Sequence, residues 1–266
     1  MVNPQQIAAL SAILRAGGIA DAELEAKWIA EDIPDYARAA EIAERRAKHE
    51  PLQYLLGKWE FYGLTLRVGE GVLIPRADTE TLVDAVLDRL RGRIAPKIVD
   101  LCTGSGCIAL AIASKRPDAK IVGIEKSHDA MQYAVTNALT LRLPVQFFHG
   151  DVLAAQTRQI FGGLDVIVCN PPYLTDSEMA QMQQELRYEP AQALSGGPDG
   201  LDFYRGITAL WQDALKPGGC IVYEVGWQQA EAVAEILTQN GFSEIERLRD
   251  LGGNYRAVVG KRVHTS

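Results

Sequence analysis

The tetrapeptide Asn-Pro-Pro-Tyr follows a short apolar run and combines residue types that suit the binding of a planar amino group. Its members are Asn170, Pro171, Pro172 and Tyr173. The two prolines stiffen the backbone and lack N–H donors, so carbonyl oxygens and the Asn170 side-chain oxygen remain as acceptors. Two acceptors would fix both protons of an NH₂ group, and the Tyr173 ring would stack on its plane. The same four residues, taken alone, also fit a rigid turn.

An amino group held in this way points its remaining electron density in one direction, which suits transfer of a methyl group from an in-line sulfonium donor. An amide or aromatic amine is a poor nucleophile because its lone pair is delocalised, so polarisation and exclusion of water are the available remedies. No general base is obligatory, because a methylated amide nitrogen sheds its proton readily. We therefore expect Asn170 and Tyr173 to be catalytic, and all four residues to bind the substrate.

A second chemical signal is a glycine-containing loop between a predicted strand and a predicted helix. The loop runs from Asp100 to Gly106 and reads Asp-Leu-Cys-Thr-Gly-Ser-Gly. Glycines at such a turn let a ligand approach the backbone, and the following helix presents unpaired N–H groups. The spacing of Gly104, Gly106 and Ala109 also fits a loose dinucleotide fingerprint. Taken alone, the loop fits S-adenosylmethionine, a dinucleotide or a structural turn.

Acidic residues near this loop favour S-adenosylmethionine over a dinucleotide. Asp100 would oppose a dianionic pyrophosphate, whereas it suits the ammonium and sulfonium groups of S-adenosylmethionine. Glu125 ends the next predicted strand, where a carboxylate can accept hydrogen bonds from the ribose hydroxyls of either cofactor. Asp151 follows the third predicted strand and suits an adenine amino group, with Val152 offering an apolar edge to the ring. Glu125 also fits a solvated strand end, and Asp151 also fits a helix cap.

The chain from residue 78 onward predicts the scaffold that must position these residues. Short apolar strands alternate with amphipathic helices, as in a parallel sheet covered on both faces. The last two strands leave no room for a crossover helix and should pair antiparallel. The predicted strands are Lys97–Leu101, Lys120–Glu125, Val145–His149, Asp165–Cys169, Cys220–Val225, Ser243–Arg247 and Arg256–Gly260. The expected fold is α/β, with a Rossmann-like seven-stranded, mostly parallel sheet and an antiparallel edge strand.

The residues before this region have a different character. Three amphipathic helical patterns within residues 1–57 predict a small helical domain that depends on its neighbour for stability. Residues 58–77 predict a two-stranded β-hairpin linker, and an irregular linker is the alternative. The methyl-transfer chemistry belongs to a third domain over residues 78–266, whose first helix Asp78 should cap. The long polar segment 174–199 interrupts the alternation and should form a functional loop.

Composition and charge limit the possible functions. The chain has 266 residues, 47% hydrophobic and 23% charged, which excludes disordered and low-complexity classes. Its net charge of −7 argues against binding that depends on neutralising duplex phosphates. No apolar run approaches the length of about 20 residues that spans a membrane, and no secretory signal is visible. The four cysteines form no C-x-x-C pair and share no metal-ligand spacing with histidines, so we expect buried thiols in a reducing cytoplasm and no metal.

The glycine loop and the Asn-Pro-Pro-Tyr motif together resemble the amino-group branch of class I S-adenosylmethionine-dependent methyltransferases. Over about residues 50–260 the chain resembles, more specifically, the peptide chain release factor N(5)-glutamine methyltransferases. The segments that carry this likeness are Pro51–Gly57, Glu60–Leu64, Val72–Arg76, Asp78–Glu80, Glu189–Pro190, Ala193–Gly197, Asp199–Leu201, Phe203–Arg205 and Glu224–Gly226. The N-terminal helices match only in type and position.

The resemblance implies methylation of the side-chain amide nitrogen of the glutamine in the Gly-Gly-Gln motif of class I peptide chain release factors. S-adenosylmethionine would be the donor and S-adenosylhomocysteine the product, in the cytoplasm, without a metal, a membrane or direct nucleic-acid binding. The helical domain over residues 1–57 would help to recognise the release factor. The expected cofactor-binding residues are Asp100, Cys102, Thr103, Gly104, Ser105, Gly106, Glu125, Asp151, Val152 and Asn170.

Three residues depart from the usual pattern of this family. Cys102 stands where many members have glycine, so we expect a negative φ there. Glu125 replaces the more usual aspartate, which lengthens the reach to the ribose by one methylene. Ala77 stands where proline often follows the arginine. None of these departures touches the amide-binding motif, although they bear on the affinity for the cofactor.

Four other functions share part of this evidence. A ribosomal-protein glutamine methyltransferase would carry both motifs, although Arg76–Glu80 and Pro51–Gly57 favour the release-factor branch. A DNA adenine methyltransferase uses a similar amine-holding motif but needs a basic face. An NAD-dependent oxidoreductase would leave Asn170–Tyr173 unexplained, and a nucleotide-binding adaptor protein would need no amine clamp.

Overall fold

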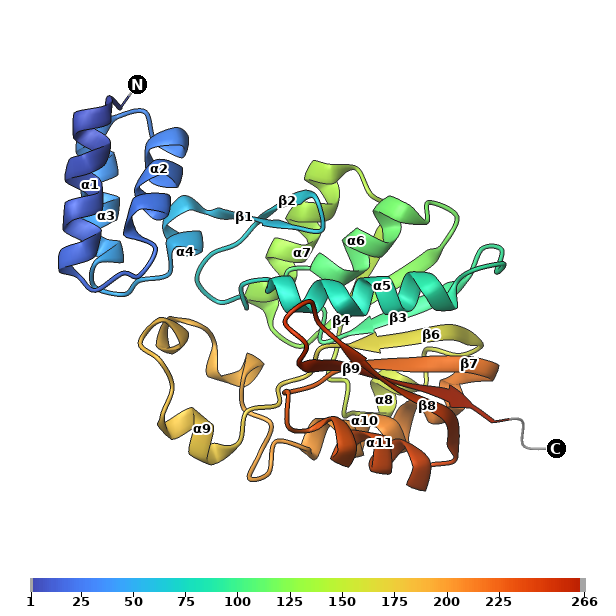
Figure 1. Ribbon diagram of the computed structural model, residues 1–266. Helices are drawn as coiled ribbons and strands as arrows, with labels where there is room; N and C mark the ends of the chain where they lie inside the picture. Colours follow the sequence, from blue (N-terminus) through green and yellow to red (C-terminus); the bar gives the residue numbers. More distant parts are fainter. Residues whose placement is uncertain (1, 264–266) are drawn as a thin grey trace.

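A seven-stranded sheet forms the centre of the computed structural model, which describes residues 2–263 (Figure 1). The end of the expected catalytic domain, 264–266, lies outside the described residues. The strands are β3 (Lys97–Leu101), β4 (Lys120–Glu125), β5 (Val145–His149), β6 (Leu164–Cys169), β7 (Leu215–Glu224), β8 (Phe242–Arg249) and β9 (Tyr255–Arg262). They lie in the order β5-β4-β3-β6-β7-β9-β8, and β9 is antiparallel to both of its neighbours. The predicted mostly parallel sheet with an antiparallel edge is confirmed.

The direction in which strands are added to the sheet reverses at β3. This strand pairs in parallel with β4 on one side and with β6 on the other. Leu101 at the end of β3 lies opposite Cys169 at the end of β6, so the loops that follow them leave the sheet side by side. Open parallel sheets bind ligands at such a switch point. The topology therefore brings the glycine loop and the Asn-Pro-Pro-Tyr motif to one place.

Helices cover both faces of the sheet (Figure 1). One face carries α5 (Glu80–Arg89), α6 (Cys107–Lys115) and α7 (His128–Leu141), and the other carries α8 (Ala155–Arg158), α10 (Asp202–Trp211) with the 3-10 turn η4 (Gln212–Ala214), and α11 (Ala230–Gln239). Ile98 and Val99 are adjacent in β3 but belong to different buried apolar clusters, one on each face. Burial on both faces explains why the sequence of β3 is a nearly continuous apolar run. No helix of residues 2–263 is long and apolar enough to cross a membrane.

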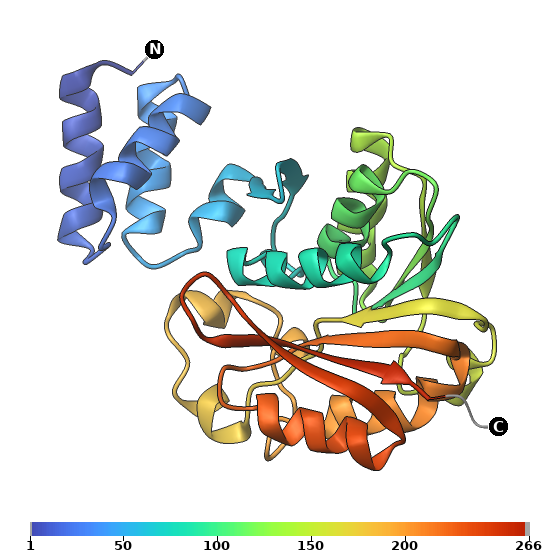
Figure 2. The same ribbon diagram turned by 45° about the vertical axis from the view of Figure 1, so that its right-hand side comes forward.

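The N-terminal helices pack around an apolar cluster of their own, apart from the sheet (Figure 2). They are α1 (Pro4–Ala16), α2 (Ala22–Asp32), α3 (Tyr36–Arg46) and α4 (Leu52–Leu56). Asn3 caps α1 by accepting a hydrogen bond from the Gln6 N–H at 2.9 Å, and proline occupies the first helical position. The short helix α4 was not predicted. It ends at Gly57, and the antiparallel hairpin of β1 (Lys58–Phe61) and β2 (Leu64–Arg67) follows.

Asp78 does not cap the helix that follows it, so this prediction was wrong. Residues Ala77–Thr79 form a 3-10 turn, η1, and α5 begins only at Glu80. The Asp78 carboxylate instead pairs with the Arg256 guanidinium of β9 at 2.9 Å. This ion pair ties the start of α5 to the antiparallel strand.

The long polar segment 174–199 folds into short elements beside the sheet. These are α9 (Asp176–Ala180) and the 3-10 turns η2 (Glu185–Tyr188) and η3 (Ala191–Ala193). The segment closes on itself, because the Leu174 N–H donates to the Leu194 carbonyl at 2.8 Å and the Gly196 N–H donates to the Leu174 carbonyl at 2.8 Å. Its end therefore returns to the strand end from which it began.

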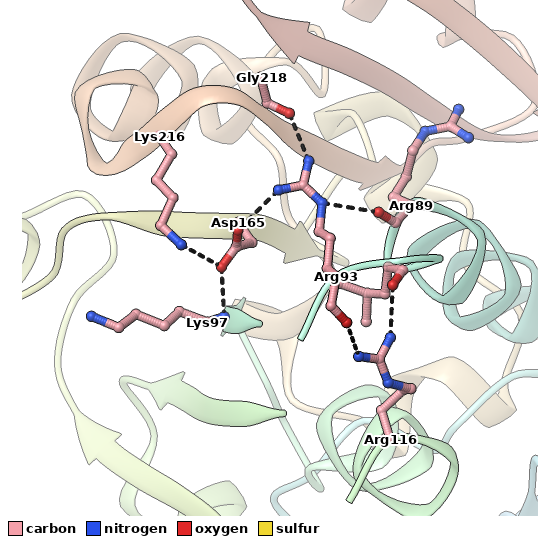
Figure 3. A network of polar contacts seen from close by, with 8 residues as sticks. Arg89, Arg93, Lys97, Arg116, Asp165, Lys216 and Gly218 are labelled. Carbon is pink, nitrogen blue, oxygen red and sulfur yellow. Dashed lines mark hydrogen bonds and ion pairs between the residues drawn. The ribbon is translucent and has the colours of Figure 1, made fainter. Parts of the chain in front are cut away.

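An ionic network around the buried Asp165 carboxylate ties the strands together at the end of the sheet opposite the switch point (Figure 3). Asp165, near the start of β6, accepts hydrogen bonds from Arg93 at 2.9 Å and from the Lys97 N–H and the Lys216 ammonium at 2.8 Å each. Arg93 also donates to the Gly218 carbonyl at 2.8 Å. Burial opposes ionisation of Asp165, but these hydrogen bonds outweigh it and hold its pKa below the usual range. The network fixes the scaffold without contacting the loops at the switch point.

Candidate active site

A cavity of about 330 Å³ opens at the carboxyl edge of the sheet, beside the switch point. Several of the expected site residues line it, namely Cys102, Thr103, Gly104, Ser105, Glu125, Asp151, Val152, Asn170 and Pro172. The lining does not include Asp100, Gly106, Pro171 or Tyr173. The structure thus brings the glycine loop, both acidic strand ends and Asn170 around one space.

Two glycines of the loop adopt φ angles in the left-handed region, +55° at Gly104 and +80° at Gly106. A Cβ at Gly106 would lie 3.1 Å from Phe147 and 3.2 Å from Leu110, so a side chain there would crowd these neighbours as well as strain the positive φ. No atom lies within 4 Å of the Cβ position of Gly104. Because Gly104 lines the cavity, a ligand can approach its backbone directly.

Cys102 has a φ of +57°, so the expectation of a negative φ was wrong. The turn out of β3 imposes this conformation, because the next residue, Thr103, donates its N–H to the Ile124 carbonyl of β4 at 3.0 Å. A non-glycine residue in the left-handed region is strained by roughly 1–2 kcal/mol. The Cys102 side chain packs against the buried apolar cluster that includes Cys169.

Asp100 is fully buried rather than placed at the mouth of the loop, where the sequence suggested it. Its Oδ2 accepts hydrogen bonds from the Thr103 hydroxyl at 2.5 Å and the Ala109 N–H at 3.3 Å, while Oδ1 has no partner. Burial raises the pKa of Asp100 to about 7 in spite of these hydrogen bonds. A cation in the neighbouring cavity favours the ionised carboxylate, whereas a pyrophosphate opposes it. Because Asp100 is only partly ionised near neutral pH and does not line the cavity, the charge argument made from the sequence is weaker at the observed position.

Glu125 at the end of β4 joins the glycine loop to the loop that follows its own strand. Its Oε2 accepts a hydrogen bond from the Gly104 N–H at 2.9 Å. Its Oε1 accepts from the N–H groups of Lys126 at 2.9 Å and Ser127 at 2.8 Å. Three backbone donors therefore hold this carboxylate in one orientation at the wall of the cavity.

Asp151 and Val152 form another part of the wall, after β5. The Asp151 carboxylate accepts from the Leu153 N–H at 2.9 Å and pairs with the Lys126 ammonium at 2.8 Å. Burial opposes ionisation, but these two partners hold the pKa of Asp151 below its usual value. The Val152 carbonyl accepts a hydrogen bond from the Trp211 indole at 2.7 Å, which anchors the wall to α10.

Tyr173 and Pro172 are covered by the end of the 174–199 segment. A Cβ at Gly196 would lie 2.7 Å from the Tyr173 Cα and 2.8 Å from the Pro172 carbonyl oxygen, so the close approach requires glycine. The Gln229 side chain donates to the Tyr173 carbonyl at 2.9 Å. Burial raises the pKa of the Tyr173 phenol well above its ordinary value, so the ring stays neutral.

Asn170 contacts one buried residue that the sequence did not identify as a site residue. Its Nδ2 donates to the Thr79 hydroxyl oxygen at 3.5 Å. Thr79 is 1% exposed and also lines the cavity. It belongs to the segment Asp78–Glu80, which carries the family likeness, and this was the only sequence signal that could have pointed to it.

An unpredicted pair, Arg76 and Glu189, closes one side of the cavity. The buried Glu189 carboxylate is paired with the Arg76 guanidinium and also accepts from the Ile74 N–H at 2.9 Å. Arg76 and Pro190 both line the cavity. The pair ties the segment after the hairpin to the 174–199 segment. In the described part of the chain, no group of three or more His, Cys, Asp or Glu side chains is placed to hold a metal ion.

Known methyltransferases are similar to most of this chain. The family described as "Methyltransferase small domain" matches residues 77–198. A release factor glutamine methyltransferase from Thermodesulfovibrio yellowstonii is 45% identical over 222 residues, which cover 82% of this chain and 78% of the relative. Another from Geobacter sulfurreducens is 39% identical, covering 92% of this chain and 91% of the relative. The solved hMettl16 catalytic domain is 15% identical, with a TM-score of 0.62 over 90% of this chain and 93% of that one, a likeness of fold alone.

Proposed function

This chain belongs to the release factor glutamine methyltransferases, and we propose that it methylates the side-chain amide nitrogen of the Gly-Gly-Gln glutamine in class I peptide chain release factors. The observation that carries the proposal is that Gly104 and Asn170 line one cavity at the switch point. The accessible backbone of Gly104 and the Asn170 side chain, which can hydrogen-bond to an amide, therefore border the same space.

The residues around the cavity fit S-adenosylmethionine as the methyl donor. When bound, it supplies a methyl group on a positively charged sulfur. Gly104 leaves its backbone open, and Asp100 lies buried nearby with an oxygen that has no partner. Glu125 offers carboxylate oxygens to ribose hydroxyls in a fixed orientation, and Asp151 offers an acceptor for an adenine amino group.

The substrate amide belongs on the Asn170 side of the cavity. The Asn170 side-chain oxygen accepts one N–H of the glutamine amide, and the Pro171 carbonyl accepts the other. The proposal assigns the neutral Tyr173 ring to stack on the amide plane, although Tyr173 itself does not line the cavity. Apolar lining residues such as Ile74 and Ile108 keep water away from the nitrogen, which sheds its proton after the methyl group has been transferred.

The same proposal assigns the N-terminal helices to recognition of the release factor. The acidic balance of the chain suits a folded protein partner better than DNA or an anionic membrane. Because release factors work on ribosomes, the reaction belongs in the cytoplasm. Within the proposal, residues 1–57 contact the protein substrate and residues 78–266 perform the chemistry.

Incubation with methyl-labelled S-adenosylmethionine and three separate acceptors tests this function. The acceptors are a class I release factor, ribosomal protein and DNA. We expect label on the release factor alone, and on its Gly-Gly-Gln glutamine when the peptides are analysed by mass. A release factor with that glutamine changed to alanine is the control and should stay unlabelled. Label on the ribosomal protein or on DNA, with none on the release factor, would overturn the proposal.

A further inference from the structure

One buried asparagine of α7, Asn137, holds both the hairpin and the glycine loop. Its Oδ1 accepts a hydrogen bond from the Arg67 N–H at 2.7 Å, and its Nδ2 donates to the Arg67 carbonyl at 3.1 Å and to the Ser105 carbonyl at 3.0 Å. We propose that Asn137 is a positioning residue, which fixes the glycine loop for the cofactor and couples that loop to the hairpin. This inference rests on the proposed function in its choice of cofactor.

The three hydrogen bonds leave the Asn137 amide only one orientation. An asparagine amide has an acceptor oxygen on one side and two N–H donors on the other. After a rotation of half a turn, the NH₂ group would face the Arg67 N–H and the oxygen would face two carbonyl oxygens, so all three contacts would be unfavourable. The residue is 1% exposed, so bulk water cannot replace a lost partner. Asn137 is therefore a rigid connection between its two neighbours.

On the loop side, Asn137 holds the carbonyl of a peptide group whose N–H is also fixed. The Ser105 carbonyl and the Gly106 N–H belong to one peptide group, and this N–H donates to the Thr103 carbonyl at 2.8 Å. Ser105 lines the cavity next to Gly104, the residue at which a ligand can approach the backbone. Because both ends of the peptide group are held, the part of the loop that borders the cavity keeps one conformation.

On the hairpin side, the same amide holds Arg67, the residue at which β2 ends. The next residue, Val68, donates its N–H at 3.2 Å to the carbonyl of Gly57, which ends α4. The helix α4 packs through Leu52 into the apolar cluster of the N-terminal helices. A short bonded route therefore leads from the helical domain to the glycine loop, and Asn137 is the step between the hairpin and the loop.

The chain that leaves the hairpin forms another wall of the cavity, so its position also matters for the cofactor. Gly71 and Ile74 both line the cavity. This chain lies directly on α7, because a Cβ at Gly69 would overlap the Tyr133 hydroxyl of that helix. The strand β2 lies beside the same helix (Figure 1). Asn137 therefore fixes two walls of the cavity relative to each other, the glycine loop and the segment that follows the hairpin.

Hydrogen exchange of two amides, measured with and without S-adenosylhomocysteine, tests the inference. The Gly106 N–H reports on the loop and the Val68 N–H on the hairpin, and both donate to backbone carbonyls rather than to Asn137. In the wild type, the ligand should slow exchange at both amides. Asn137→Ala should speed exchange at both in the free protein, abolish the response of Val68 to the ligand, and raise the Kd for S-adenosylhomocysteine by about tenfold.

Tyr62→Phe is the matched control, because it removes a hydrogen bond from the hairpin to the Asp84 carboxylate of α5, at 2.6 Å, that does not involve the glycine loop. It should keep the wild-type Kd and the response of Val68 to the ligand. Wild-type exchange at Gly106 and a wild-type Kd in Asn137→Ala would overturn the inference. If Asn137→Ala fails to fold, a Val68 amide that does not respond to the ligand in the wild type would overturn it instead. Should the wild type bind no S-adenosylhomocysteine, the proposed cofactor fails, and exchange at Gly106 in the ligand-free variants still decides the inference.

Discussion

Gly104 and Cys102 show how backbone conformation at single residues determines what the cavity holds. Both have positive φ angles, and both line the cavity. At Gly104 the Cβ position is open space, which leaves the loop backbone accessible to a ligand. Cys102 adopts the same conformation although it carries a side chain, which costs strain energy. The surrounding fold therefore fixes the loop backbone, and Gly104 is the residue at which a ligand can approach that backbone.

Gly104→Val should abolish binding of S-adenosylmethionine, measured by calorimetry. A β-branched side chain strains the positive φ, and its methyl groups would project into space that the ligand needs. Gly92→Val is the matched control, because Gly92 also has a positive φ (+74°) and open space around its Cβ position but does not line the cavity. It should lose stability but keep cofactor affinity. Unchanged affinity in Gly104→Val would contradict the assignment of this loop.

The sequence pointed to site residues whose type is unusual at their position in the motif. It did not point to site residues of types that are also common in purely structural roles. Asn170 before two prolines and Gly104 at a strand end have few other uses, and the cavity includes both. A buried threonine in a short turn is common in proteins, so the contact of Thr79 with Asn170 was not predicted; β6 and η1 meet only in the folded structure. The φ of Cys102 was mispredicted because residue type favours negative values, whereas the turn between β3 and α6 imposes a positive one.

At the scale of elements, strands were predicted better than helix ends. The first three sheet strands match their predicted bounds. β3 and β4 are apolar runs that are mostly buried, whereas the edge strand β5 is only half-buried. Asp78 was misassigned because its partner, Arg256, comes from the far end of the chain. The fold of the 174–199 segment was equally out of reach, since Glu189 and Gly196 hold it through tertiary contacts.

Glu189→Ala should loosen the 174–199 segment and weaken cofactor binding by about tenfold. The change removes the partner of Arg76 and the acceptor of the Ile74 N–H, which together hold the segment against the cavity. Hydrogen exchange of residues 174–194 and calorimetry measure the two effects. Glu178→Ala is the control in the same segment, because the exposed Glu178 side chain only caps α9. Equal exchange rates in the two variants would show that the ion pair does not hold the segment.

At the scale of the molecule, a charged cluster joins the helical bundle to the 174–199 segment of the catalytic unit. The Arg46 guanidinium bonds to Glu25 within the bundle at 2.7 Å and to Glu185 of the 174–199 segment at 3.2 Å. The His49 ring also lies 2.9 Å from Glu185. Because the side chain of Arg46 is mostly buried, this cluster helps to fix the angle between the bundle and the cavity.

Glu185→Ala should raise the Kd for the release factor by about tenfold, or 1.4 kcal/mol, without changing the Kd for S-adenosylmethionine. The bundle would lose its fixed angle to the cavity, whereas Arg46 would keep Glu25 as a partner. Binding titrations of each ligand separate the two effects. Glu23→Ala is the control, since the exposed Glu23 pairs with the equally exposed Arg15 on the outside of the bundle. A release-factor Kd that stays at the wild-type value in Glu185→Ala would exclude this cluster from partner recognition.

The central claim, that Asn170 holds the substrate amide during methyl transfer, is tested most directly by Asn170→Ala. Single-turnover transfer to a class I release factor at saturating cofactor should slow by about 10²–10³-fold, or about 3–4 kcal/mol of transition-state stabilisation. Asn170→Asp keeps acceptor oxygens and should lose no more activity than Asn170→Ala. The Kd for the cofactor should change far less than the rate. A near-wild-type rate in Asn170→Ala would mean that the motif is only a stiff turn, and would contradict the mechanism.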